Sequence, residues 1–291
     1  MPDQPLLLSA SSIGSYRSCP FKYFARYECQ RVPVEESEES LPLKFGLAFH
    51  KGREIWRLTR DVNEALAQAE ATFGQASILE DLYTVARLRD LLSIYFEYYA
   101  DDVRRFTPIL PELPFHLKLS DGVDFHGRVD EVVKENATGR IFFVDTKTTQ
   151  RPGSFLAYPN TQMTGYAWAG HQIYGPEIFG GIIVDIVGVY KTKPQRAKSG
   201  PNPWKQGAAP HDVFFRYIVE FTPEQTREWA DETMDTARSI LARRESNIWP
   251  RWSACMSYQR ECGYLSVCKA PPQERMNLLY SDAFTLKPTQ D

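Results

Sequence analysis

Residues 124–147 read DFHGRVDEVVKENATGRIFFVDTK, and this stretch decides the fold. Asp124–Val133 and Arg140–Thr146 both have the composition of β-strands, and the turn-forming residues 135–139 lie between them. The pattern predicts a β-hairpin. Phe142-Phe143-Val144 is a continuous apolar run of the kind found in strands that are buried on both faces.

Two acids and a lysine should converge on this hairpin. Side chains two positions apart on a strand share a face, so Asp145 and Lys147 should project together, with Asp130 beside them on the neighbouring strand. Close carboxylates repel each other unless a cation lies between them, and hard oxygen ligands favour Mg²⁺ or Mn²⁺. A lysine beside that cation can orient or help deprotonate a water and stabilise charge on a phosphate. The pattern therefore predicts a metal-dependent phosphodiesterase site.

The alternative is that these residues are ordinary exposed charges on a hairpin. Against it, the apolar run before Asp145 places this acid at the end of a core strand. A carboxylate buried there is costly unless it has a partner. The position of Asp145 thus favours a functional site over a solvated surface.

The remaining elements predict an α/β fold with a mixed central sheet. Helices are expected at Ala10–Arg26, Leu43–Thr59, Asn63–Phe73, Asp81–Arg104, Asn160–Tyr174 and from Thr222 to about Arg244. Strands are expected at Glu112–Leu119, Gly180–Lys191 and Asp212–Phe221, besides the two of the hairpin. We expect one domain over 1–291: a helical lobe at 1–110, a sheet core at 111–222 and a carboxyl-terminal helix with a cysteine-rich segment at 223–291.

Composition agrees with a globular protein. The 291 residues are 43% hydrophobic, enough for one large core or a core and a helical lobe. The sequence has no run of eighteen apolar residues and no signal peptide at residues 1–4, so we expect a soluble, cytoplasmic protein without a membrane partner. A net charge of −3 is unusual for a nucleic-acid binder. The basic run Lys191–Lys205, which includes Trp204, could track a phosphate backbone or be a solvated hairpin tip.

Five motifs together resemble the PD-(D/E)xK nucleases, in particular the RecB/AddB-like branch that includes phage exonucleases and CRISPR adaptation nucleases. In chain order they are Ser9 to Tyr23 with Cys19-Pro20, Phe45-Gly46 to His50, Gly127-Arg128-Val129-Asp130, Asp145-Thr146-Lys147-Thr148, and Gln162 to Tyr166. The chain departs from the family name, because Val129 stands in place of the proline and Asp145 in place of a glutamate. The resemblance implies a restriction-endonuclease-like core.

The resemblance also implies roles for single residues. It makes His50, Asp130 and Asp145 metal ligands, adds the carbonyl of Thr146 as a further ligand, and gives Lys147 the task of positioning the attacking water.

Three more residues are candidates for the site. Gln162 and Tyr166 lie four positions apart, on one face of the expected helix, where they could support the site or touch the substrate. They could instead be a polar pair on a packed helix. Glu112 precedes the first expected strand, where the family often has an acid.

The resemblance implies a metal-dependent DNA exonuclease of recombination, repair or CRISPR adaptation. Its partners would be DNA ends and a single-strand annealing protein, a helicase or a CRISPR integration complex. The first alternative is a DNA-end-binding adaptor subunit with little or no nuclease activity. A second is an iron–sulfur redox protein, although the sequence has no glycine-rich nucleotide motif.

The cysteines form a second signal. Cys255, Cys262 and Cys268 fall within fourteen residues and resemble the tail of iron–sulfur members of the same branch, whose fourth thiolate comes from the amino-terminal Cys-Pro, here Cys19. Four thiolates suit a [4Fe–4S] cluster. Zn²⁺ and reduced, unligated thiols stay open as alternatives, although the gaps of six and five residues lack the short knuckles usual in zinc sites. Cys29 has the character of a small apolar residue.

Overall fold

The chain folds into two compact units in the computed structural model, which describes residues 5–37, 40–74, 82–153, 160–191, 194–198, 204–252, 255–257 and 260–287. One unit, the sheet unit, comprises residues 41–115 and 127–227. The other, the terminal unit, comprises residues 1–40, 116–126 and 228–291. The first and last segments of the chain thus belong to one unit. The expected single domain with bounds at 110 and 222 stays a prediction.

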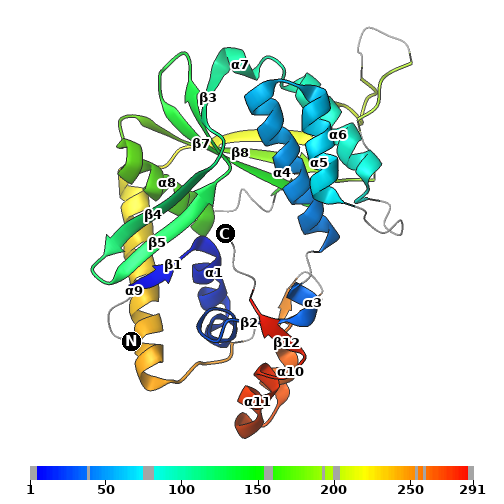
Figure 1. Ribbon diagram of the computed structural model, residues 1–291. Helices are drawn as coiled ribbons and strands as arrows, with labels where there is room; N and C mark the ends of the chain where they lie inside the picture. Colours follow the sequence, from blue (N-terminus) through cyan, green and yellow to red (C-terminus); the bar gives the residue numbers. More distant parts are fainter. Residues whose placement is uncertain are drawn as a thin grey trace. The chain divides into compact units, whose positions relative to one another are not determined.

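A mixed five-stranded sheet forms the centre of the sheet unit (Figure 1). Its strands are β3 (Phe106–Leu110), β6 (Glu131–Glu135), β7 (Ile141–Thr149), β8 (Phe179–Gly188) and β9 (Phe214–Val219). They lie in the order β3-β6-β7-β8-β9; β7 and β8 are parallel, and the other neighbours are antiparallel. The predicted α/β class with a mixed central sheet is confirmed.

The hairpin is confirmed, but its first strand was predicted too long. Strands β6 and β7 pair antiparallel from Glu131 opposite Val144. The expected continuous strand Asp124–Val133 is wrong, because β5 (Val123–Val129) ends before Asp130 and β6 begins after it. Strand β5 has β1 (Leu6–Leu8) and β4 (Leu113–Ser120) as neighbours, whereas β6 lies between β3 and β7. The chain leaves one sheet and enters the other at Asp130, so the strand hydrogen bonding is interrupted at this residue.

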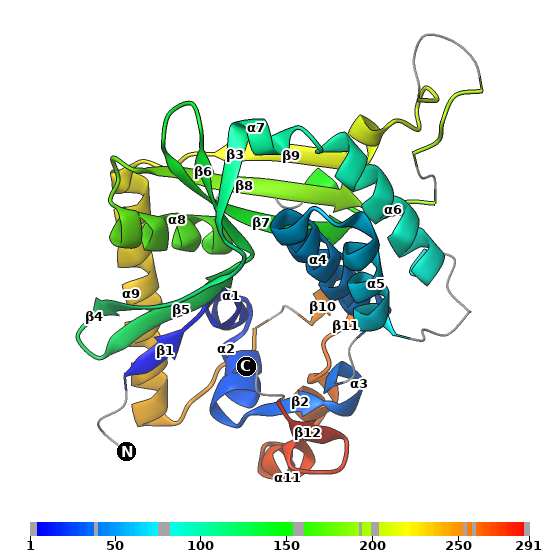
Figure 2. The same ribbon diagram turned by 45° about the horizontal axis from the view of Figure 1, so that its top comes forward.

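Helices cover both faces of the sheet (Figure 2). The helices of the sheet unit are α4 (Leu41–Thr59), α5 (Val62–Phe73), α6 (Val85–Tyr98), α7 (Asp102–Arg105) and α8 (Thr161–Tyr174). On β7, Phe143 meets Tyr174 of α8, and Asp145 shares that face. Asp185 is the register partner of Thr146 on the opposite face, where it meets α4 and α6. The sheet is therefore enclosed between α8 and the α4–α6 group.

One helix and one edge strand differ from expectation. The single helix Asp81–Arg104 is wrong, because α6 starts after its cap Thr84 and ends at Tyr98, and α7 follows as a separate turn. Asp101 and Asp102 favour helix starts over helix interiors, which explains the break; Asp81 lies outside the described residues. Strand β3 was missed, since Pro108 weakens a strand pattern except at a sheet edge.

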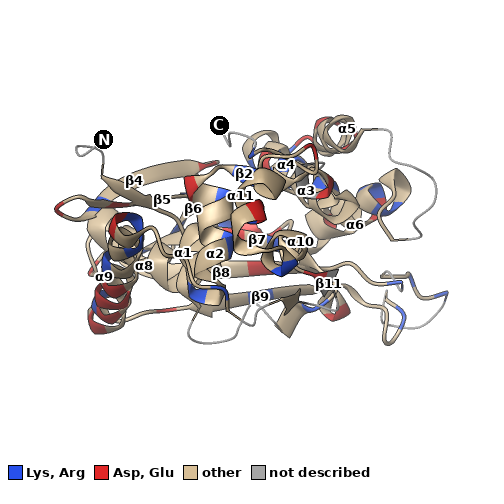
Figure 3. Cartoon of the chain, turned by 90° about the horizontal axis from the view of Figure 1, so that it is seen from below, with Lys and Arg blue, Asp and Glu red and all other residues tan. Residues whose placement is uncertain are grey.

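The terminal unit is mainly helical. Besides β1, its elements are α1 (Ala10–Ser18), α2 (Pro20–Tyr23), a π-helix (Phe24–Glu28), β2 (Arg31–Pro33), α3 (Val34–Ser37), β10 (Met256–Ser257), β11 (Arg260–Glu261), α10 (Leu265–Lys269), a 3-10 helix (Pro272–Glu274), α11 (Arg275–Leu279) and β12 (Phe284–Leu286). Helix α9 (Pro223–Ser246), with acidic residues repeated along it, runs into this unit from the sheet unit (Figure 3). Strand β12 pairs antiparallel with β2, so backbone hydrogen bonds join the carboxyl-terminal segment to the amino-terminal segment.

The expected continuous helix Ala10–Arg26 is wrong. Helix α1 ends at Ser18, and Cys19 is extended, with φ −164° and ψ 112°, before α2 begins at Pro20. A residue that precedes proline is disfavoured in the helical region, which explains the break. Cys19 therefore stands at a junction between two helices. In the described part of the chain, no helix is long and apolar enough to cross a membrane.

Candidate functional site

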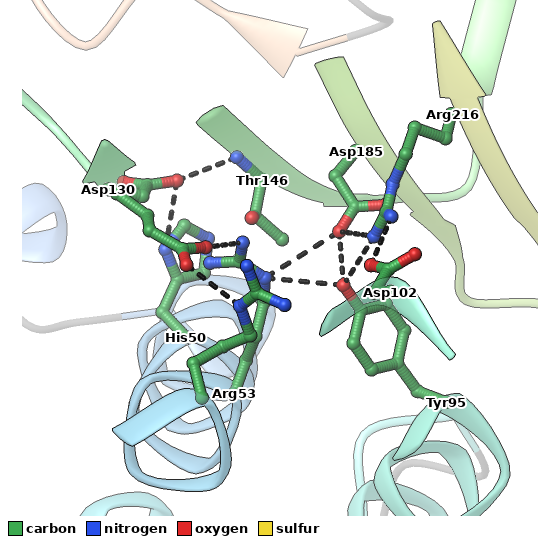
Figure 4. Close-up of polar contacts among 10 residues, drawn as sticks. His50, Arg53, Tyr95, Asp102, Asp130, Thr146, Asp185 and Arg216 are labelled. Atoms are coloured by element: carbon green, nitrogen blue, oxygen red, sulfur yellow. Dashed lines mark hydrogen bonds and ion pairs between the residues drawn. The ribbon is translucent and has the colours of Figure 1, made fainter. Parts of the chain in front are cut away.

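His50, Asp130 and Thr146 meet at the point where the chain changes sheets (Figure 4). Asp130 Oδ2 lies 3.3 Å from Nδ1 of His50, which comes from α4. The same oxygen accepts a hydrogen bond of 2.6 Å from the backbone N–H of Thr146 in β7. The side chains of His50 and Asp130 are 32% and 24% exposed, so a small solute can reach them.

Asp145 and Lys147 lie on the face of β7 opposite to the side chain of Thr146, and Asp145 contacts α8. Lys147 Nζ donates to Asp145 Oδ1 over 3.0 Å, and Gln162 Nε2 donates to the same oxygen over 3.1 Å. Gln162 Nε2 also lies 3.3 Å from the hydroxyl of Tyr166, which donates to the carbonyl of Arg128 over 2.8 Å. Gln162 and Tyr166 thus connect α8 to Asp145 and to the end of β5.

The two carboxyl groups have opposite pKa shifts. Burial raises the pKa of Asp130, but His50, Lys147 and the Thr146 N–H lower it more, to about 2. Burial raises the pKa of Asp145, and the negative charge of Asp130 adds to this effect. Burial lowers the pKa of Lys147, but Asp145 and Asp130 outweigh it, so its net pKa is raised. One buried and one partly exposed carboxylate, Asp145 and Asp130, therefore share a single permanent positive charge, that of Lys147.

This donor set fits a hard cation. Asp145 is 2% exposed, and its Oδ2 receives no well-oriented hydrogen bond from any residue that the structure describes, although Lys147 Nζ lies 3.0 Å away. Carboxylate oxygens are preferred ligands of Mg²⁺ and Mn²⁺. Within the described ranges, no three His, Cys, Asp or Glu side chains are already arranged so that they could hold a metal ion. The ligand roles of His50, Asp130, Asp145 and Thr146 stay predictions.

Two further candidates lie apart from this constellation. Glu112 is about half exposed, and its Oε2 lies 3.6 Å from Arg128 Nη1. In the basic run, the guanidinium of Arg196 stacks 4.1 Å from the centre of the Trp204 ring and pairs with Glu97. Residues 192–193 and 199–203 of this run lie outside the described residues, so its contact with nucleic acid stays a prediction.

A buried charge network beside the site was missed by sequence reasoning (Figure 4). Its members are Arg53, Arg57, Tyr95, Asp102, Glu131, Asp185 and Arg216. Two signals could have revealed it. Arg53 and Arg57 follow His50 by three and seven positions, which places all three on one side of α4. Asp185 is the one charged residue in the otherwise apolar strand β8.

The terminal unit places four cysteines around one cavity, although no three of them, as described, are already arranged to hold a metal ion. Cys19, Cys255, Cys262 and Cys268 line one cavity of about 240 Å³. Burial raises the pKa of the Cys268 thiol to about 11, and the charges of the other three thiols add to the shift. Cys29 does not line the cavity and packs half-buried against the neighbouring apolar cluster. Ser253, Ala254 and Tyr258 of the tail motif lie outside the described residues.

The chain matches a known protein family. The sequence pattern that defines the PD-(D/E)XK nuclease superfamily matches residues 7–269. The match includes every residue of the predicted catalytic and cysteine motifs. No curated protein sequence matches the chain.

Proposed function

Because the chain belongs to the PD-(D/E)XK nuclease superfamily, we propose that it is a metal-dependent exonuclease that shortens DNA from its ends. Membership implies a nuclease that binds DNA, and members of the superfamily generally use divalent metals such as Mg²⁺. The mixed sheet between helices agrees with a restriction-endonuclease-like core. The finer statements rest on the residues of the candidate site.

The observation that carries the proposal is the unbalanced charge at Asp130 and Asp145. Asp145 is hydrogen-bonded to Lys147, whose charge also lowers the pKa of Asp130, and the pKa of Asp145 is raised by burial and by Asp130. His50, Asp130 and Asp145 would hold Mg²⁺ or Mn²⁺, with the Thr146 carbonyl as a further ligand. When bound, such an ion activates a water and stabilises the attacking and leaving oxygens of a phosphodiester.

The residues around this position have distinct tasks. The raised pKa of Lys147 keeps its ammonium protonated, so we assign it the orientation of the attacking water and the stabilisation of charge on the phosphate. Gln162 holds the Asp145 carboxylate from α8, which leaves Asp145 Oδ2 for the cation. Tyr166 fixes the carbonyl of Arg128, two residues before Asp130, and so supports the position of that acid.

For the cysteines, we propose a [4Fe–4S] cluster with a structural role. Cys19, Cys255, Cys262 and Cys268 line one cavity, and four thiolates are the ligands of such a cluster. Lys22, Arg251 and Lys269 line the same cavity and would offset the negative charge of four thiolates. Such a cluster would fasten Cys19 to the carboxyl-terminal segment. Bound zinc, measured by elemental analysis of purified protein, would contradict it.

The proposed setting is DNA recombination, repair or CRISPR adaptation, with an annealing protein, a helicase or an integration complex as partner. The alternative is a DNA-end-binding adaptor without nuclease activity. The contacts of Asp145 with Lys147 and Gln162 favour the enzyme, because a binding surface has no need of a buried carboxylate that a second carboxylate, Asp130, repels.

End-labelled single- and double-stranded DNA tests the proposal. Wild type with Mg²⁺ or Mn²⁺ should shorten the strands stepwise, and EDTA should stop the reaction. Lys147→Ala should abolish cleavage, whereas Lys134→Ala, an exposed lysine on the neighbouring strand β6, should cleave like wild type. Binding of ends without cleavage by folded wild type would favour the adaptor. Cleavage of closed circular DNA would contradict the exonuclease assignment.

A further inference from the structure

The buried network links α4, which carries His50, to Glu131, the residue next to Asp130, and to β8, the strand that pairs with β7. Arg53 lies one helical turn after His50 on α4, and its Nη2 donates to Glu131, the residue next to Asp130. Arg57 Nε donates to the other oxygen of the same carboxylate over 2.7 Å. Glu131 is 2% exposed, so these charge-assisted bonds are shielded from water.

The second side of Arg53 faces β8. Its Nε lies 3.6 Å from Asp185 Oδ2 and 3.2 Å from the Tyr95 hydroxyl, which itself donates to Asp185. Asp185 is fully buried and is the register partner of Thr146, whose N–H binds Asp130. A single guanidinium therefore contacts the neighbour of Asp130 on one side and the strand partner of Thr146 on the other.

We propose that Arg53 is a positioning residue that fixes His50 and Asp130 relative to β7 so that both can bind the catalytic metal. The inference rests on the proposed function of this site. Arg53 contacts neither substrate nor metal; it acts through Glu131 and Asp185. A planar guanidinium has donors on several edges and can bridge two carboxylates, which the single ammonium of lysine does poorly.

The variant Arg53→Lys keeps the charge and loses the bridge. We expect its affinity for Mn²⁺, measured by isothermal titration calorimetry on the full chain, to fall about tenfold or more, as is usual when the support of a metal ligand is lost. The kcat for DNA cleavage should fall with it, whereas KM for DNA should stay near the wild-type value, because no DNA contact has changed.

Asp102→Asn is the matched control. Asp102 pairs with Arg216 at the far end of the same network and contacts neither Arg53 nor Glu131 among the described interactions. We expect this variant to lose stability in urea while its Mn²⁺ affinity stays that of wild type. Where Arg53→Lys does not fold, Glu131→Gln tests the bridge from its other end, since glutamine keeps the volume and one acceptor oxygen.

The outcomes separate the two proposals. Wild type that binds Mn²⁺ and cleaves DNA, together with an Arg53→Lys protein of unchanged Mn²⁺ affinity, would overturn the positioning role alone. Equal losses of affinity in Arg53→Lys and Asp102→Asn would also overturn it, because the loss would then follow stability. Wild type that neither binds Mn²⁺ nor cleaves DNA would overturn the proposed function and this inference together.

Discussion

Two groups of charged side chains lie side by side in the sheet unit and differ in the balance of positive and negative charge. The network behind the site pairs three carboxylates, Glu131, Asp185 and Asp102, with the three guanidiniums of Arg53, Arg57 and Arg216. The candidate metal centre has two carboxylates and one lysine, besides a histidine. The balanced group needs no ion from solution, whereas the unbalanced one gains from a cation.

Asp185 and Asp145 show the consequence of this difference. Both are almost completely buried, and burial alone raises the pKa of each. For Asp185, Arg216 and Arg53 outweigh burial and lower the pKa. For Asp145, Lys147 does not outweigh burial and the charge of Asp130, and the pKa is raised. The positively charged neighbours of each carboxyl group, and not its degree of burial, therefore decide which acid is stable as an anion.

The largest expected change in the free energy of unfolding comes from removing one carboxylate of the balanced network. Glu131→Leu would leave Arg53 and Arg57 buried without their shared carboxylate, which typically costs about 3–5 kcal/mol. Urea denaturation of the purified protein should show a corresponding loss in the free energy of unfolding. Glu112→Leu is the control, because it removes a glutamate from an exposed pair and should cost less than about 1 kcal/mol. Equal losses would show that Glu131 is not a buried partner.

The second largest change in stability should come from binding of a metal ion at the candidate metal centre. A ligand at 100 times its Kd stabilises the folded state by about 2.7 kcal/mol, so saturating Mn²⁺ should raise the free energy of unfolding of wild type. Asp145→Asn removes a proposed ligand and should respond much less. Asp121→Asn, an exposed acid, should respond like wild type. Equal stabilisation of Asp145→Asn and wild type would place the ion elsewhere.

The charged residues that would bind a metal ion could be predicted from the sequence. The charged residues that pair with one another inside the protein could not. Asp130, Asp145 and Lys147 were found because acids and a lysine next to an apolar run are unusual. Glu131 and Asp185 were not, because their partners come from α4, α6 and β9, and such pairings are set by tertiary structure. The mixed sheet was predicted from its strands, since periodicity is local.

Among the elements that were predicted too long are one strand and one helix. The break at Asp130 follows from a change of pairing partners, which one strand's pattern cannot show. The break at Cys19 had a local signal in Pro20 and could have been predicted. The junction matters for the cysteine cavity, because an extended Cys19 lines it together with three cysteines from the carboxyl-terminal segment.

A smaller effect concerns the raised pKa of Asp145. A raised pKa means that the folded protein favours the neutral carboxyl, so at neutral pH without divalent metal Asp145→Asn should be more stable than wild type. As pH falls through the raised pKa toward the ordinary value of 3.8, wild type takes up a proton there and the difference should close. Urea denaturation in EDTA across this pH range measures it. A constant difference would contradict the raised pKa.

The smallest effect should come from an ion pair outside both groups. Glu97 and Arg196 pair at 2.5 Å, but their side chains are 54% and 53% exposed. Exposed pairs contribute roughly 0.2–1 kcal/mol and are screened by salt, so Glu97→Gln should change the free energy of unfolding by less than about 0.5 kcal/mol at low salt and by nothing measurable in concentrated NaCl. Its Mn²⁺ affinity should equal that of wild type. A loss as large as that of Glu131→Leu would mean that contact geometry, and not burial, sets the energy of charge pairs in this protein; a small loss would assign the difference to burial.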